Sequence, residues 1–381
     1  MTGLPVYLDY NATTPCDPEV VEVMLPFFSG TFGNAASRSH VYGLEAEEAV
    51  DIARRQVASL IEADTSEIIF TSGATEAVNL AIRGTVEAAD ESRRHIITWN
   101  TEHKAVLDVV TYLSASGIEC TVLPVNSNGL PDMDQLADSL RKDTLLVSMM
   151  AANNETGVIM PIREAASLAH AHGALLFTDA TQAVGKIPFS VRETGADLAA
   201  FSAHKVYGPK GAGAMFVKRG ITRPKPLQFG GGHEGNLRSG TLNVPGIVGM
   251  GEALRIAGQR MKADAVHLSD LRARLLNALK SIPDIRWNAG DVPLLPHVAS
   301  ITFGFRGGDR MLAMIARDVA ASSGSACSSA IPKPSHVLAA MGLNEMDGLS
   351  TIRFSLGRST TEQDIDRVAE AIVKAVGRLR E

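Results

Sequence analysis

The chain has 381 residues, of which 45% are hydrophobic and 20% are charged. These proportions are typical of a globular protein of one large or two medium domains, and they exclude a largely disordered or fibrous chain. With 36 Lys and Arg against 42 Asp and Glu, the formal net charge is −6, which argues against bulk attraction to nucleic acid or to an anionic membrane. We therefore expect neither a direct nucleic-acid partner nor a membrane partner.

Only three cysteines occur, Cys16, Cys120 and Cys327, and none lies in a C-x-x-C spacing. This excludes a disulfide framework and a zinc knuckle. Residues 1–9 lack the basic and apolar pattern of a secretory leader, and no run of about 18 apolar residues occurs in the sequence. Together these features favour a reduced, cytoplasmic location.

The first part of the chain alternates short apolar, β-rich runs with helical patterns. A first helix is predicted after Asp17, with Pro18 at its first position, and a second covers about 44–61. The expected strands are 67–70, 95–98, 118–123, 145–149, 174–178, 197–201 and 212–217. The expected helices between them are 76–89, 104–116, 133–141 and 162–172. This alternation predicts an α/β fold with a mostly parallel seven-stranded sheet covered on both faces, with an antiparallel member among the last three strands.

Beyond about Gly246 the pattern changes to a smaller α+β unit. A long helix is predicted over about 254–280, followed by strands near 298–303 and 350–355. A closing helix is predicted to begin at a capping box formed by Thr360 and Gln363. We expect a large domain of residues 16–260 and a small domain of residues 1–15 and 261–381, with the border inside the long helix.

One glycine-rich segment matches a nucleotide-binding pattern only formally. Residues 230–235 read G-x-G-x-x-G, but Pro224 and Pro226 precede them and no helix is predicted to follow. A dinucleotide fingerprint needs a strand before it and a helix after it. No Walker A pattern is present, so the sequence argues against a dehydrogenase or a kinase.

The turn after the predicted strand 67–70 is a candidate phosphate site. Residues 71–76 read Thr-Ser-Gly-Ala-Thr-Glu and lead into a helix, whose first N–H groups and positive dipole end favour an anion. The alternative is an ordinary strand-to-helix turn capped by a hydroxyl.

Two further polar side chains follow predicted strands at the same sheet edge. Asp179 ends the run 174–178, where it is either a ligand-binding acid or a helix N-cap. Lys205 follows the run 197–201, and the alternative for any single lysine is a solvated surface position. A phosphate cradle, an acid and a lysine together are what a pyridoxal phosphate site demands.

With these residues in view, the chain resembles the cysteine desulfurases of the NifS/IscS type, a branch of the class-V aminotransferase family with pyridoxal-phosphate fold type I. The matching segments are 7–15, 71–76, 101–104, 153–155, 179–182, 202–205, 238–241 and 323–327. The last segment, Ser-Gly-Ser-Ala-Cys, separates desulfurases from most of their aminotransferase relatives. The segments span nearly the whole chain.

The resemblance implies pyridoxal 5'-phosphate as cofactor and a role for each matched residue. Lys205 would carry the cofactor as a Schiff base and act as base and acid at the substrate α-carbon. Asp179 would pair with the pyridine nitrogen, and Gln182 would hydrogen-bond the phenolic oxygen. His103 would stack on the ring and transfer protons. The residues implied to hold the phosphate are Ala74, Thr75, Ser202 and His204.

Three more roles follow from the same resemblance. Thr241 would reach the phosphate of the other subunit's cofactor, which implies a homodimer with its active sites at the interface. Asn154 would contact the cofactor and, with Arg353, bind the carboxylate of L-cysteine; arginine is suited to a bidentate grip. No metal site is expected.

Cys327 lies in the segment 322–330, which is rich in serine, glycine and alanine and is predicted to be a mobile loop that presents a thiol. The family mechanism would make its thiolate the nucleophile that takes sulfur from L-cysteine, giving a persulfide and L-alanine. Cys16 and Cys120 lack such neighbours, and both are predicted to serve packing.

The destination of the sulfur stays open at this stage. The sequence ends at Glu381, directly after the last predicted helix, where housekeeping desulfurases carry a further tail that docks the iron–sulfur scaffold. This favours a dedicated acceptor protein of a DNA phosphorothioation system, with Fe–S cluster assembly and tRNA thiolation as alternatives. The competing activities are a selenocysteine lyase, a simple aminotransferase and a non-catalytic sulfur carrier.

Overall fold

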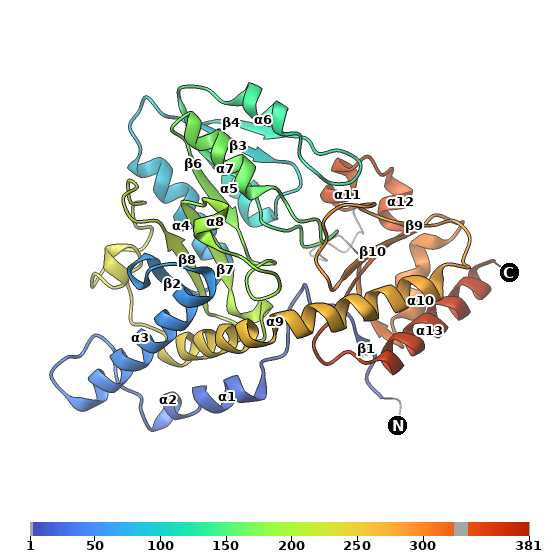
Figure 1. The fold of residues 1–381 in the computed structure, drawn as a ribbon, viewed down its shortest axis with the longest axis horizontal. Helices are drawn as coiled ribbons and strands as arrows, with labels where there is room; N and C mark the ends of the chain where they lie inside the picture. The colour runs from blue at the N-terminus through green and yellow to red at the C-terminus, as the bar shows by residue number, and fades with distance from the viewer. Residues whose placement is uncertain (1–2, 324–333, 381) are drawn as a thin grey trace.

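A computed structural model describes residues 3–323 and 334–380 (Figure 1). A seven-stranded sheet with its helices forms one end of the molecule, and a smaller α+β unit forms the other. A single long helix runs along both parts. Within the described residues no helix is long and apolar enough to span a membrane.

The large sheet contains every strand predicted for the first part of the chain. Its order is β2, β8, β7, β6, β5, β3, β4. The bounds are β2 (Ile68–Thr71), β3 (His95–Trp99), β4 (Glu119–Leu123), β5 (Thr144–Ser148), β6 (Leu175–Asp179), β7 (Leu198–Ser202) and β8 (Gly213–Val217). β8 is antiparallel to both of its neighbours, whereas the other pairs are parallel. The predicted antiparallel member is therefore β8.

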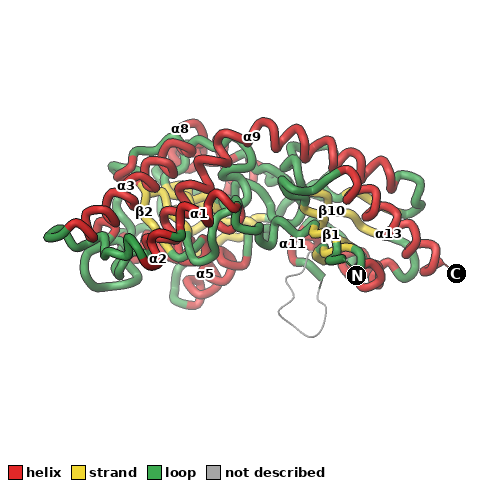
Figure 2. The backbone as a smooth tube through the Cα atoms, turned by 90° about the horizontal axis from the view of Figure 1, so that it is seen from below, coloured by secondary structure: helices red, strands yellow, loops and turns green. Residues whose placement is uncertain are grey.

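Helices cover both faces of this sheet (Figure 2). The helices of this part are α1 (Pro18–Met24), α2 (Pro26–Ser29), α3 (Val41–Ile61), α4 (Ala74–Ala88), α5 (Lys104–Ala115), α6 (Met133–Ser139), α7 (Ile162–Ala171) and α8 (Val191–Thr194), with 3-10 turns η1 (Thr65–Glu67), η2 (Ala203–Lys205) and η3 (Glu234–Asn236). On β2, Ile69 packs in the core under α4 and α5, whereas Ile68 and Phe70 pack in the core with α3 and α7. Side chains alternate along a strand, so burial on both faces explains the nearly continuous apolar runs.

The long helix α9 (Val244–Leu279) begins ten residues before the predicted start. Asn243 caps it, since its side chain accepts a hydrogen bond from the Gly246 N–H at 3.2 Å. The glycines of its first turns weaken the helical pattern in the sequence. Gly251 allows α9 to lie close to α3, because a Cβ there would come within 2.6 Å of the Ala53 Cα. Tertiary packing thus offsets the low helix propensity of glycine.

The smaller unit has a four-stranded antiparallel sheet in the order β12, β13, β10, β9. Its elements are β9 (Ile285–Trp287), β10 (Val298–Phe303), η4 (Gly308–Arg310), α10 (Met311–Ile315), β12 (Ser322–Ser323), α11 (His336–Ala340), α12 (Glu345–Leu349), β13 (Thr351–Ser355) and α13 (Glu362–Arg380). The N-terminal strand β1 (Val6–Tyr7) pairs with β11 (Val319–Ala320). One apolar core joins Leu8, Leu275 and Phe354. The division into a domain of residues 16–260 and a domain of residues 1–15 and 261–381 stays a prediction.

The predicted cap of the last helix is one residue too early. The reciprocal pair is Thr361 and Asp364: the Thr361 N–H donates to Asp364 Oδ2 at 3.0 Å, and the Asp364 N–H donates to Thr361 Oγ1 at 3.1 Å. Thr360 instead turns inward and accepts from the Gly357 N–H. Both threonines fit a capping pattern, and burial of Thr360 decides between them.

Candidate active site

A cavity of about 510 Å³ lies at the carboxyl ends of β6 and β7, next to the first turn of α4. Its lining includes nine of the predicted site residues: Ala74, Thr75, His103, Asn154, Asp179, Gln182, Ser202, His204 and Lys205. A second groove, of about 570 Å³, is lined by Met160 and Phe189 and contains none of the predicted residues. Side chains predicted from separate sequence segments therefore line a single cavity.

The predicted phosphate turn forms one wall of this cavity. Ala74 and Thr75 are the first residues of α4, so their N–H groups have no partner within the helix. Gly213 at the start of β8 allows the turn to pack tightly on the sheet, because a Cβ there would lie 2.5 Å from the Gly73 Cα. Ser202, at the end of β7, adds a hydroxyl. This wall is suited to an anion.

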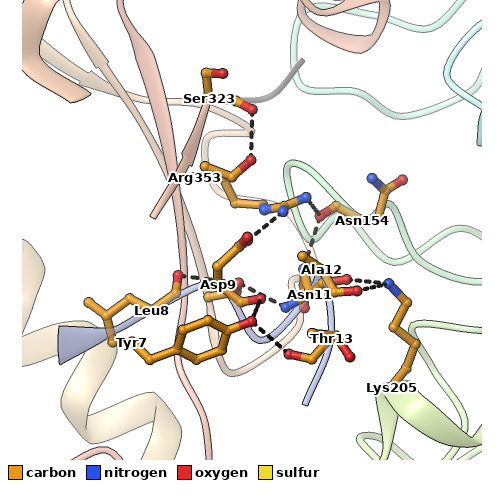
Figure 3. Close-up of polar contacts among 12 residues, drawn as sticks. Tyr7, Leu8, Asp9, Asn11, Ala12, Thr13, Asn154, Lys205, Ser323 and Arg353 are labelled. Carbon is orange, nitrogen blue, oxygen red and sulfur yellow. Dashed lines mark hydrogen bonds and ion pairs between the residues drawn. The ribbon is translucent and has the colours of Figure 1, made fainter. Parts of the chain in front are cut away.

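Asp179 and Lys205 occupy the positions that the sequence predicted. Asp179 is the buried last residue of β6, and its carboxylate accepts from the Thr181 N–H at 3.0 Å. A turn, not a helix, follows it, so the alternative of a helix N-cap is wrong. Lys205 Nζ donates to the carbonyls of Asn11 at 2.7 Å and Ala12 at 2.6 Å (Figure 3).

Burial lowers the pKa of Lys205 to about 8, and the positive charge of Arg353 acts in the same direction. Asp179 and Asp9 oppose this shift. A lysine with a lowered pKa has a larger fraction of neutral amine near neutral pH, which is the form that attacks an aldehyde. The site thus prepares Lys205 for the covalent role that the resemblance implies.

The two histidines of the cavity are held in neutral forms. His103 caps α5: its Nδ1 accepts from the Ala105 N–H at 3.1 Å, which leaves the proton of the neutral ring on Nε2. Its ring faces the cavity, where desolvation lowers its pKa although Asp179 opposes the shift. His204 Nδ1 lies 3.1 Å from Thr13 Oγ1, and desolvation together with Lys205 lowers its pKa to about 4.

Arg353 and Asn154 meet at the edge of the cavity (Figure 3). Arg353 does not line the cavity itself, but its Nη1 donates to the Asn154 carbonyl at 3.0 Å and its Nη2 donates to Asp9 at 2.7 Å. Its Nε has no hydrogen-bond partner within residues 3–323 and 334–380. A buried donor without a partner is suited to a substrate carboxylate.

Besides Arg353, two predicted residues, Thr241 and Cys327, are absent from the lining of the cavity. Thr241 lies in an exposed segment just before α9. Cys327 lies outside the described residues; the strand β12, which precedes it in sequence by four residues, places Ser322 opposite Arg353 on β13. Burial raises the pKa of Cys16 and raises that of Cys120 to about 11, and both side chains pack against apolar clusters, as predicted.

Sequence reasoning missed the role of the polar run that follows β1. Asp9 and Asn11 lie in the matched segment 7–15 without an implied role, and Lys186 lies outside every matched segment. Lys186 donates to Gln182 and Asn11, so it belongs to the same polar network. The four-residue spacing from Gln182 to Lys186 was the available signal.

These residues fit pyridoxal phosphate. An acid, a lysine and the donor-rich start of a helix surround one cavity, and Thr181 Oγ1, which also lines it, is buried without a partner among the described residues. No group of three or more His, Cys, Asp or Glu side chains suited to a metal occurs in the part of the chain that the structure describes.

Comparison with known proteins agrees with this geometry. The model of the class-V aminotransferase family matches residues 6–368. The cysteine desulfurase IscS of Edwardsiella ictaluri is 49% identical over 99% of this chain and 94% of its own length. The solved structure of a NifS-like protein superposes with a TM-score of 0.90 at 36% identity, covering 99% of this chain and 100% of that one. DndA from Streptomyces lividans gives a TM-score of 0.78 at 39% identity, with 90% and 97% covered.

Proposed function

Because this chain belongs to the class-V aminotransferase family and, within it, to the pyridoxal-phosphate-dependent cysteine desulfurases, we propose that it converts L-cysteine to L-alanine and holds the sulfur as a persulfide on Cys327. The observation that carries the proposal is the convergence of Lys205 and Asp179 on one cavity, with Arg353 hydrogen-bonded to Asn154, which also lines it.

Each of these residues has a task that its surroundings favour. The start of α4, with Ser202 and His204, holds the phosphate, and Asp179 holds the ring nitrogen in its protonated form. When bound, pyridoxal phosphate supplies an electron sink. Lys205 holds the cofactor and moves the proton at the substrate α-carbon. Arg353 and Asn154 orient the substrate carboxylate.

The net reaction balances with no further reagent. The carbon–sulfur bond of L-cysteine breaks and a sulfur–sulfur bond to Cys327 forms. One of the two thiol protons ends on the methyl group of L-alanine, and the other stays with the persulfide. The terminal sulfur of the persulfide is then open to attack by an acceptor thiolate.

Mass spectrometry of the protein after incubation with L-cysteine tests this proposal. We expect one additional sulfur atom on the peptide that contains Cys327, together with release of L-alanine. Cys327→Ser should lose the adduct and keep the absorbance of the bound cofactor. Persulfide formation by this variant with free cysteine would falsify the assignment, and inactivity on L-cysteine would favour a selenocysteine lyase.

We further propose that an acceptor protein takes the sulfur from Cys327 and that the chain forms a homodimer. The likeness to IscS accords with Fe–S cluster assembly and the likeness to DndA accords with DNA phosphorothioation, with tRNA thiolation as an alternative. Capture of acceptor proteins on the persulfide form, followed by sulfur-transfer assays with each, separates these routes. A cytoplasmic location also remains part of the proposal.

The exposed position of Thr241 supports the homodimer, since it leaves the residue accessible to a second subunit. Exposed apolar side chains after α1 and at the start of α3, among them Phe28, Phe32, Val41 and Tyr42, also favour association. Light scattering tests the dimer directly. Mixing Thr241→Val subunits with Lys205→Ala subunits then tests whether Thr241 serves the partner's site, because only the mixed dimer would contain one intact site.

A further inference from the structure

Lys186 does not line the cavity and has no implied role, but it hydrogen-bonds to Gln182, which does line the cavity. Lys186 is only partly exposed, and its Nζ points inward to Gln182 Oε1 and lies 3.5 Å from Asn11 Oδ1. No carboxylate pairs with it among the described residues, and desolvation holds its pKa well below the usual range. A lysine with no acidic partner at this depth needs an explanation beyond charge pairing.

The contacts of Lys186 dictate which way the Gln182 amide faces. Gln182 Nε2 donates to the Asn11 carbonyl at 3.1 Å, while Oε1 accepts from Lys186. Reversal of the amide would set its NH₂ group against the N–H groups of Lys186 and its oxygen against the Asn11 carbonyl. Both new pairs would be repulsive, so the observed orientation is the one that satisfies every group.

Asn11 is fixed in its turn by other buried groups. Its Nδ2 donates to the Asn154 carbonyl at 2.9 Å, so its Oδ1 faces Lys186 and the buried His297, whose Nε2 lies 2.8 Å away. The carbonyl that receives Gln182 Nε2 also receives Lys205 Nζ at 2.7 Å. The orientation of the Gln182 amide is therefore set by a connected network that includes the cofactor-binding lysine.

We propose that Lys186 is a positioning residue, which locks the Gln182 amide so that its second N–H faces the cavity and donates to the ring oxygen of bound pyridoxal phosphate. This role rests on the proposed function, because it requires the cofactor. This role explains why Lys186 has no acidic partner. A hydrogen-bond donor at Gln182 Oε1 keeps the amide in the orientation in which an N–H of Nε2 faces the ligand.

The test uses Lys186→Met in the cofactor-loaded protein without L-cysteine, and reads the absorbance maximum of the cofactor and the pH midpoint of its change. Loss of a donor leaves more negative charge on the ring oxygen, which then holds the neighbouring proton of the Lys205–cofactor linkage more tightly. We expect the midpoint to rise by about one pH unit, a tenfold change in proton affinity, in Lys186→Met and equally in Gln182→Leu.

The double variant separates positioning from simple charge. If Lys186 acts through Gln182, Lys186→Met adds no further rise to Gln182→Leu. Additive rises would mean that only the charge of Lys186 matters, and an unchanged midpoint in Lys186→Met would mean that it has no influence; either result overturns the proposal. Lys262→Met, an exposed lysine on α9, is the matched control and should leave the midpoint unchanged.

Lys186→Gln keeps a donor without the charge and covers the case in which the methionine variant does not fold. Its midpoint should stay near that of the wild type, and a rise as large as that of Gln182→Leu would overturn the proposal. Because L-cysteine is absent from these measurements, their outcome is independent of persulfide formation. Failure of the desulfurase assignment would appear only in the mass spectrum after L-cysteine.

Discussion

Asp9 accepts a hydrogen bond from Arg353 Nη2 at 2.7 Å, although the two residues are 344 positions apart in the sequence. Both side chains are largely shielded from solvent, at 22% and 8% exposure. The pair joins the segment after β1 to β13 at the edge of the cavity (Figure 3). Arg353 is thereby held by two partners, Asp9 and the Asn154 carbonyl, before any substrate arrives.

Asp9→Asn should weaken the binding of L-cysteine more than its conversion. The amide keeps the shape but removes the charge that fixes the guanidinium plane, and a less ordered Arg353 loses affinity for a carboxylate. We expect KM for L-cysteine to rise about tenfold, equivalent to ~1.4 kcal/mol, with kcat changed less than about threefold. Steady-state measurement of L-alanine release checks this, with the exposed Glu370→Gln as control. A fall in kcat at constant KM would contradict it.

Glu155 should make the stability of the cofactor-free protein depend on pH. Burial raises its pKa to about 7, although the Ser335 hydroxyl and Arg353 oppose the shift. Between pH 4.5 and 7 the folded state then binds more protons than the unfolded state, so the free energy of unfolding falls as pH rises. Above pH 7 the full penalty, about 3 kcal/mol, is present.

Glu155→Gln should remove this penalty, because the amide has the same shape and cannot ionise. Its advantage in unfolding free energy over the wild type should grow by about 3 kcal/mol from pH 4.5 to pH 8 in urea titrations. A difference that stays constant over this range would show that Glu155 does not titrate as described.

Glu234→Ala should destabilise the large domain. The Glu234 carboxylate accepts from both terminal nitrogens of Arg54, at 2.6 and 2.9 Å, and from the Phe70 N–H at 2.7 Å. Its removal leaves a shielded guanidinium and a backbone donor without partners. We expect a loss of about 3 kcal/mol in unfolding free energy, measured by denaturant titration. The Arg54→Met, Glu234→Met pair should cost less than the sum of its single changes; strict additivity would contradict the coupling.

Removal of pyridoxal phosphate should lower the melting temperature of the wild type. A ligand that binds only the folded state adds about 2.7 kcal/mol at one hundred times its Kd. Lys205→Ala should reduce this gain, since it removes the covalent attachment, and the added cofactor should then raise the melting temperature less. Differential scanning calorimetry with and without cofactor checks both points; equal gains in the two proteins would argue against attachment at Lys205.

Local sequence pattern predicts the strands of the large sheet but not the exact starts of two helices. Each strand of the large sheet is an apolar run between turn residues, so local pattern was sufficient. The start of α9 was missed because Gly246, Gly249 and Gly251 hide it, and its packing on α3 is a tertiary effect. The cap of α13 was placed one residue early for a similar reason, since burial selects between two adjacent threonines.

The candidate site shows the same division between what local sequence predicts and what tertiary structure adds. Sequence alone determined the α/β class, the residues at the carboxyl ends of the strands and the candidate nucleophile, because these depend on local periodicity and on residue chemistry. Only the tertiary structure decided how Asn11 and Lys186 hold Gln182, how His297 contacts Asn11, and how Asp9 holds Arg353. Those contacts join segments up to 344 residues apart, and a hydrogen bond depends on distance and direction in space, which no local pattern encodes.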